Sequence, residues 1–339
     1  MESNRTMRGD GFITYKGIKD SRELRVGVYS RSINATVICF FGLMSLLGIC
    51  LNLYTIAVVK RSKRTRCCKL QLINLAVADT CTSIIMPMFL IYHILLIPFP
   101  GGEMCAKIFC FIGLSMFYLG PLCHIAISVE RFVAVYFPFR MLRYRQNKRL
   151  VVIGSTWIVT MIASIEGLIC GRISYFENSV YGKQIPMASC HDSNSNRTKY
   201  ILTQSVKYIL PAIIIATMYT LVTIKMCQQA KVSMEAAITD VKISNKQRRS
   251  KEMVKMLAIS ASLAIITWIP FEVICATGFD HNRKFIILTS LLSGLQLSNC
   301  FSTPIIYFAF NNSLRKEYRR SIQWVGSFIS KKSDTTTWL

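Results

Sequence analysis

Seven long apolar stretches constrain the fold of this sequence more than any other feature. A membrane-spanning helix needs about 20 largely apolar residues, and the stretches lie near residues 35–59, 70–97, 105–129, 150–170, 201–227, 253–276 and 285–310. Each is continuously apolar, which favours helices over the alternating strands of a membrane barrel. The chain is 52% hydrophobic and only 17% charged, which is more apolar than a soluble core requires. The sequence therefore predicts an all-α membrane protein with a seven-transmembrane helix bundle at residues 35–310.

Basic residues between the stretches predict which way the bundle faces. Lys and Arg resist translocation, and they cluster after the first, third, fifth and seventh stretches. The first two clusters are Lys60, Arg61, Lys63, Arg64, Arg66 and Lys69, followed by Arg140, Arg143, Arg145, Lys148 and Arg149. These segments are expected to be cytoplasmic. The tail at 1–34 is then extracellular, although it carries basic residues of its own and shows no apolar secretory signal.

The net charge of +24 raises the alternative of a nucleic-acid partner. This charge is spread over loops beside the apolar stretches, where it sets topology and attracts the anionic inner leaflet. We therefore expect membrane lipid and no nucleic acid as a partner.

Two further features concern the outer side. Sequons for N-glycosylation begin at Asn4, Asn34 and Asn196, all in segments expected outside.

Cys105 opens the third stretch at its outer end and Cys190 lies in the long outer loop. An oxidising environment permits a disulfide between them, so we predict Cys105–Cys190. No cysteine or histidine cluster has metal-ligand spacing, and no metal site is expected.

Four motifs occur in order within the apolar stretches. They are NLAVAD at 74–79, SVERFVAVYFP at 128–138, TWIPF at 267–271 and NCFSTPIIY at 299–307. As an ordered set they resemble the signatures of rhodopsin-like, G-protein-coupled receptors of the peptide-receptor kind, over roughly residues 35–322. The resemblance implies a plasma-membrane receptor that converts binding of an extracellular ligand into activation of a heterotrimeric G protein.

The resemblance also implies roles for residues of an activation switch. Arg131 matches the arginine that its acidic neighbour, Glu130, holds until activation frees it. Tyr219 and Tyr307 match two tyrosines that swing inward. The remaining expected members are Trp268 as the toggle below the ligand pocket, Pro270 as the kink that makes the sixth helix a lever, and Pro304 in the seventh.

Asp79 and Asn299 match the residues of the family's sodium site. A buried carboxylate at mid-membrane does require a cation, a proton or a hydrogen-bond network. Gly120 and Thr303 stand where this site usually has Ser and Asn. We expect no cofactor, with an allosteric sodium ion at Asp79 left as the alternative.

The outer half of the bundle contains the ligand-binding candidates, which are His93, Lys207, Glu272, Gln296 and Trp268. Gly113 stands where amine receptors carry their aspartate, which disfavours an amine. Lys207 and Glu272 have two interpretations that stay open: an ion pair between the fifth and sixth helices, or two sites for charged ligand groups. The outer loop near 171–200 resembles the hairpin-forming loop of peptide receptors, so a peptide is the expected ligand.

On the cytoplasmic side, Arg131, Pro138 and Phe139 are expected to contact the G protein, since Phe139 matches the family's apolar knob. Residues 311–322 are expected to form a short amphipathic eighth helix on the inner leaflet, and 323–339 a cytoplasmic tail. The tail's Ser and Thr residues are candidates for phosphorylation and arrestin binding. Its end, Thr337-Trp338-Leu339, suits a PDZ groove.

Other protein classes fit less well. No spaced catalytic set or phosphate-cradling loop indicates an enzyme. A secondary transporter is the closest rival, but it would be expected to show internal repeats and paired broken helices. Within the receptor class, a constitutively active or decoy receptor is the alternative, because several switch positions depart from the family pattern.

Overall fold

The computed structural model describes eleven stretches of the chain. They are residues 31–61, 69–94, 99–139, 146–178, 183–190, 197–236, 241–277, 283–310, 315–316, 318–320 and 323. The sequons at Asn4 and Asn196, the side chain of Asn34 and the C-terminal Thr337-Trp338-Leu339 lie outside what is described. These predictions therefore stay predictions.

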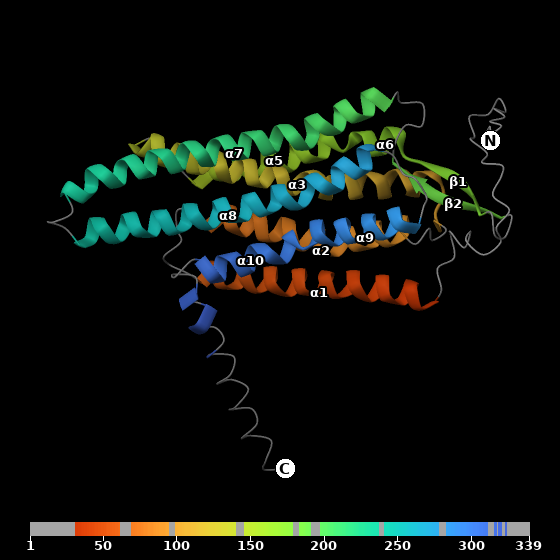
Figure 1. Ribbon diagram of the computed structural model, residues 1–339, viewed down its shortest axis with the longest axis horizontal. Coiled ribbons are helices and arrows are strands. Elements are labelled where there is room, and N and C mark those ends of the chain that lie inside the picture. The colour runs from red at the N-terminus through yellow and green to blue at the C-terminus, as the bar shows by residue number, and fades with distance from the viewer. Residues whose placement is uncertain are drawn as a thin grey trace, which may run out of the picture.

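Long helices running side by side make up the bundle (Figure 1). Their bounds are α1 Arg31–Arg61, α2 Lys69–Ile94, α3 Glu103–Tyr136, α5 Gln146–Ala163, α6 Ile165–Cys170, α7 Arg197–Ala236, α8 Val241–Thr277, α9 Arg283–Leu297 and α10 Asn299–Phe310. Two strands, β1 Arg172–Asn178 and β2 Lys183–Ser189, form an antiparallel hairpin at the end of the bundle where α1 begins (Figure 1).

The helices confirm the seven-helix bundle. Six are long and apolar enough to cross a membrane among the residues described. The seventh span is divided at Ser298 into α9, with 15 residues, and α10, with 12. Large apolar side chains such as Leu43, Ile158 and Ile266 lie outward with about 60% of their surface exposed. Such a surface suits contact with lipid tails rather than water, and the chain is a multi-pass membrane protein.

Two proline kinks are bridged by side chains of α1. A proline in a helix leaves the carbonyl four residues earlier without its usual donor. Pro87 leaves the carbonyl of Ser83, and Ser45 Oγ donates to it at 2.6 Å. Pro304 leaves the carbonyl of Cys300, and Asn52 Nδ2 donates to it at 2.5 Å. In lipid, a neighbouring helix is one of the few sources of such donors, so these two bonds join α1 to α2 and to α10.

Gly48 lets α1 approach α2 closely enough for this arrangement. A Cβ at Gly48 would lie 2.1 Å from Ser83 Oγ and 2.9 Å from Ser83 Cβ. Real atoms do not approach so closely, so a larger residue would push the two helices apart. Small residues at such crossings are a common device of membrane bundles.

Polar contacts also centre α3 in the bundle. Asn74 on α2 accepts a hydrogen bond from Trp157 Nε1 on α5 at 2.9 Å, and its amide donates to Cys123 Sγ on α3 at 3.4 Å. At the C-terminal end of α3, Tyr136 Oη donates to the carbonyl of Leu221 on α7 at 3.1 Å. Because α3 contacts so many other helices, its side chains are well placed to connect the outer and inner ends.

The hairpin is joined to the N-terminal part of α3 by a disulfide, but the predicted partner of Cys190 is wrong. Cys190 bonds to Cys110, with their Cα atoms 5.2 Å apart, while Cys105 is exposed and carries a free thiol. Five residues along a helix turn the side chain by about 140°. Cys105 and Cys110 therefore point to different faces of α3, and the buried face carries Cys110.

Candidate functional site

Three charged residues meet near the C-terminal end of α3. Arg131 Nη2 lies 3.8 Å from Glu130 Oε1, and both side chains are less than 10% exposed. Arg149, in the first turns of α5, brings its Nε to 3.2 Å from the same oxygen. The expected pairing of Arg131 with Glu130 is therefore present, and a second arginine, which the motif analysis did not single out as a site residue, shares the carboxylate.

Other expected switch residues lie on neighbouring helices. Tyr219 on α7 and Tyr307 on α10 are both buried, with 6% and 1% of their surfaces exposed. Beyond the end of α3, Phe139 has 82% of its surface exposed and Pro138 is exposed as well. A large aromatic side chain held out in this way is a typical contact for another protein or for lipid.

Trp268 lies in the C-terminal third of α8, two residues before Pro270. Its indole meets the buried His124 ring of α3 edge to face, with ring centroids 5.9 Å apart. Three residues further along α8, Phe271 stacks on Phe117 of α3, with centroids 6.1 Å apart. Aromatic contacts therefore join α8 to α3 on both sides of Pro270.

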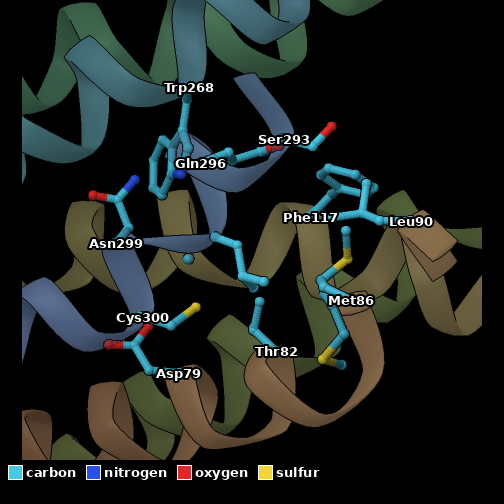
Figure 2. Close-up of a pocket in the computed structure, with 13 residues that line it drawn as sticks. Asp79, Thr82, Met86, Leu90, Phe117, Trp268, Ser293, Gln296, Asn299 and Cys300 are labelled. Atoms are coloured by element: carbon cyan, nitrogen blue, oxygen red, sulfur yellow. The ribbon is translucent and has the colours of Figure 1, made fainter. Parts of the chain in front are cut away.

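A narrow cavity of about 40 Å³ lies beside Trp268 and reaches Asp79 (Figure 2). Asp79 Oδ2 and Gln296 Oε1, both buried, have no hydrogen-bond partner in the part of the chain that is described. Both residues line the cavity, together with Asn299. Two buried acceptor oxygens around a space of this size fit water or a small cation.

Other polar side chains near this cavity are hydrogen-bonded to one another. The Asn299 amide donates to Thr267 Oγ1 on α8. Thr303 Oγ1 donates to the Asn299 carbonyl at 3.2 Å and lies 3.3 Å from Ser260 Oγ. These bonds join α8 to α10 and leave Asp79 as the charged group of the cavity.

In the half of the bundle that carries the hairpin, Lys207 pairs with Glu166 at the start of α6. Its ammonium also lies 5.1 Å from the centre of the Tyr118 ring on α3. The side chains of Lys207 and Glu166 are 18% and 32% exposed, so the pair is not sealed. The side chains of His93 and Glu272 lie outside what the structure describes. Glu166 was not predicted, because Glu272, one helical turn beyond Trp268, was the acid expected opposite Lys207.

An aromatic cluster fills the space beside Gly113 at the outer end. It comprises Phe89 and Tyr92 of α2, Phe109 and Phe117 of α3, and Phe99 of the preceding loop, with ring centroids 5.2–6.1 Å apart. A Cβ at Gly113 would lie 2.3 Å from Cδ2 of Phe89, so only glycine leaves room for this ring. The Phe99 amide donates to the Pro186 carbonyl of β2 at 2.8 Å, which joins the cluster to the hairpin.

The short C-terminal segment packs against the inner end of α1. Tyr318 is buried, its hydroxyl is hydrogen-bonded to Thr55 Oγ1, and its carbonyl accepts a 3.0 Å bond from Tyr54 Oη. Burial raises the pKa of the Tyr318 phenol to about 12, so it remains protonated at neutral pH. This side chain therefore contacts α1, although the segment that carries it was expected to lie on the lipid surface.

Comparison with known proteins identifies the family. The family described as 7 transmembrane receptor (rhodopsin family) matches residues 51–307, more than half of the chain. The chain belongs to this family. The family consists of receptors rather than enzymes.

Individual relatives are similar over most of the chain. Somatostatin receptor type 4 of Rattus norvegicus is 24% identical over 84% of this chain and 72% of its own length. Neuropeptide receptor 22 of Caenorhabditis elegans is 23% identical over 85% of this chain and 69% of its own. Tachykinin-like peptides receptor 99D of Drosophila melanogaster is 24% identical over 84% of this chain and 56% of its own.

Proposed function

We propose that this protein is a plasma-membrane receptor, with its N-terminus outside, that converts binding of an extracellular peptide into activation of a heterotrimeric G protein. The observation that carries the proposal is the buried Glu130–Arg131 pair at the cytoplasmic end of α3. An ion pair in so apolar a setting is costly to maintain, and a switch that exchanges one partner of Arg131 for another accounts for it.

A peptide is the ligand that the outer end of the bundle suits best. The hairpin is joined there to α3 by the disulfide and to the aromatic cluster by the Phe99 amide. Its strands offer backbone groups to an extended chain, and the relatives include receptors named for peptides. The Phe89 ring lies against Gly113, which turns a ligand away from the α2–α3 side and towards Lys207 and Glu166.

Further partners follow from the cytoplasmic side. The exposed Phe139 is the proposed apolar contact for the G protein. Arrestin, a PDZ protein and anionic lipid are proposed partners of the basic and hydroxyl-rich C-terminal residues. For the Asp79 cavity we propose weak sodium binding, because Gly120 and Thr303 stand where this site usually has Ser and Asn.

The proposal is tested in cells that carry a panel of G-protein dissociation reporters and are exposed to a peptide library. Wild-type receptor should give a saturable response to at least one peptide. Arg131→Ala should lower nucleotide exchange roughly ten- to hundredfold, the effect of losing a charge-assisted contact, while surface expression is retained. Arg319→Ala, which removes an exposed arginine, is the matched control. Equal signalling by Arg131→Ala and wild type would remove Arg131 from the mechanism.

A response from no peptide, together with high basal exchange, would replace the peptide receptor by a constitutively active one. Silence in every reporter despite proven surface expression would favour a decoy receptor.

A further inference from the structure

We propose that Arg149 is a positioning residue of the switch: it competes with Arg131 for Glu130 and so sets how firmly Arg131 is held in the resting state. The inference rests on the proposed function, because the switch acts on a G protein. It assigns to the start of α5 a role in setting basal activity.

The geometry favours Arg149 in this competition. Both guanidinium groups approach one oxygen, Glu130 Oε1, at 3.2 Å from Arg149 Nε and 3.8 Å from Arg131 Nη2. The exposed fractions of the three side chains are 15%, 9% and 7% for Arg149, Arg131 and Glu130. Water therefore screens the three charges little, and the nearer arginine takes the larger share of the attraction.

The charges alone give the sign of the effect. Arg149 draws on the carboxylate that holds Arg131, and its own positive charge repels Arg131. Both effects weaken the resting position of Arg131. Removing the charge of Arg149 should then strengthen the Glu130–Arg131 pair and lower basal activity. If Arg149 only supported folding, its loss would lower surface expression and leave the exchange per receptor unchanged.

The position of Arg149 also connects the pair to the cytoplasmic surface. It lies in the first turns of α5, which begins at Gln146, and the exposed Phe139 lies seven residues before that start. A protein that docks on Phe139 therefore contacts a residue that lies close in the sequence to Arg149, the arginine that competes for Glu130. A shift of α5 would change the Arg149–Glu130 distance without touching Arg131.

The test measures basal nucleotide exchange per surface receptor for Arg149→Gln. We expect a decrease of roughly two- to fivefold, the range typical of partly buried neighbouring charges. Arg149→Lys keeps the charge and should restore most of the wild-type rate. Lys148→Gln removes the same charge from an exposed position one residue earlier, so it controls for net charge and for the dipole of α5. It should change little.

The dependence on Glu130 gives a second criterion. In a Glu130→Gln receptor, where no carboxylate remains to be shared, Arg149→Gln should lose the part of its effect that comes from competition and keep only the smaller part that comes from repulsion of Arg131. An unchanged or raised basal rate in Arg149→Gln overturns the inference. The same decrease in the Glu130→Gln background also overturns it.

A measurement without a G protein separates this inference from the proposed function. The coupling between Glu130→Gln and Arg131→Gln is measured in the thermal midpoint of purified receptor, with and without Arg149→Gln. Competition predicts a stronger Glu130–Arg131 coupling once Arg149 is replaced, and equal couplings contradict it. A receptor that passes this test but activates no G protein would refute the proposed function alone.

Discussion

The α1–α2–α10 side of the bundle and its α7–α8 side treat their helix prolines differently. On the first side, Ser45 and Asn52 of α1 donate to the carbonyls that Pro87 and Pro304 leave open. On the second, Pro270 leaves the carbonyl of Ile266, to which no side chain donates among the described residues, and Ile266 itself is 65% exposed. The carbonyls freed by Pro87 and Pro304 therefore accept a hydrogen bond from α1, whereas the carbonyl freed by Pro270 accepts none from a described side chain.

This difference shows where the molecule can bend. A kink whose freed carbonyl is bonded to another helix moves only when that bond breaks, which costs about 1–3 kcal/mol in a buried setting. A kink without such a bond lacks this particular restraint. The kinks of Pro87 and Pro304 are therefore held by bonds from α1, whereas no such bond holds the kink of α8 among the described residues. α8 is joined to α10 elsewhere, through Asn299–Thr267 and Thr303–Ser260.

The largest expected effect comes from removing the disulfide that holds α3, the helix that lies between both sides. Cys110→Ser should lower the free energy of unfolding by about 2–5 kcal/mol, because it removes the disulfide to Cys190. Cys105→Ser should change it little, since that thiol is free and exposed. Thermal unfolding of purified receptor measures both. The opposite ranking of the two variants would restore the pairing expected from the sequence.

A smaller effect is expected from opening the bridge at Pro304. Asn52→Leu should lower the free energy of unfolding by about 1–3 kcal/mol, because the buried Cys300 carbonyl loses its donor. In a Pro304→Ala receptor the helix supplies that donor itself, so Asn52→Leu should cost less there. Thr220→Val on α7, where the hydroxyl is exposed and bonds only its own helix, is the control from the other side. Similar losses for Asn52→Leu and Thr220→Val would break the comparison.

Closing the kink on the α7–α8 side should act mainly on signalling. Pro270→Ala restores one backbone hydrogen bond, to Ile266, and should stabilise the resting receptor by about 0.5–1.5 kcal/mol. Basal exchange should fall correspondingly while the thermal midpoint rises. The two quantities are measured by reporter dissociation and by thermal unfolding. A fall in the thermal midpoint would show that the kink supports the fold rather than its motion.

The smallest expected effect concerns sodium in the cavity between the two sides. Asp79 comes from α2, Asn299 from α10 and Trp268 from α8. Replacing sodium by a large organic cation should lower the thermal midpoint only slightly, since a ligand at its own dissociation constant stabilises by about 0.4 kcal/mol. Asp79→Asn should abolish this difference. A large sodium effect that survives Asp79→Asn would place the ion elsewhere.

Much of the fold was predictable because its causes are local. A run of about 20 apolar residues is costly in water wherever it occurs in the chain, so the spans can be found without knowing what they touch. The pairing of Glu130 with Arg131 was also predictable, since the two residues are adjacent and the resemblance gave them roles. Ser298, which divides the seventh span, carried no comparable signal.

Contacts between distant segments were less predictable. Cys110 and Cys105 are equally plausible partners for Cys190 until the buried face of α3 is known. Lys207 had an acid one helix further along the sequence in Glu272, yet its partner in the structure is Glu166. Arg149 was counted among the basic residues that set topology, and only the packing of α5 on α3 shows that it reaches Glu130.

The sequence by itself determined that this chain crosses a membrane, how many times it does so, and which receptor family it belongs to. These properties depend on apolar runs and on ordered short motifs, which are complete within single segments. Only the tertiary structure decided which cysteine closes the disulfide, which carbonyls of the kinked helices are bridged and which arginines share Glu130. Each of these depends on the rotation and approach of two helices, and the pattern of one helix alone does not specify its neighbour's face.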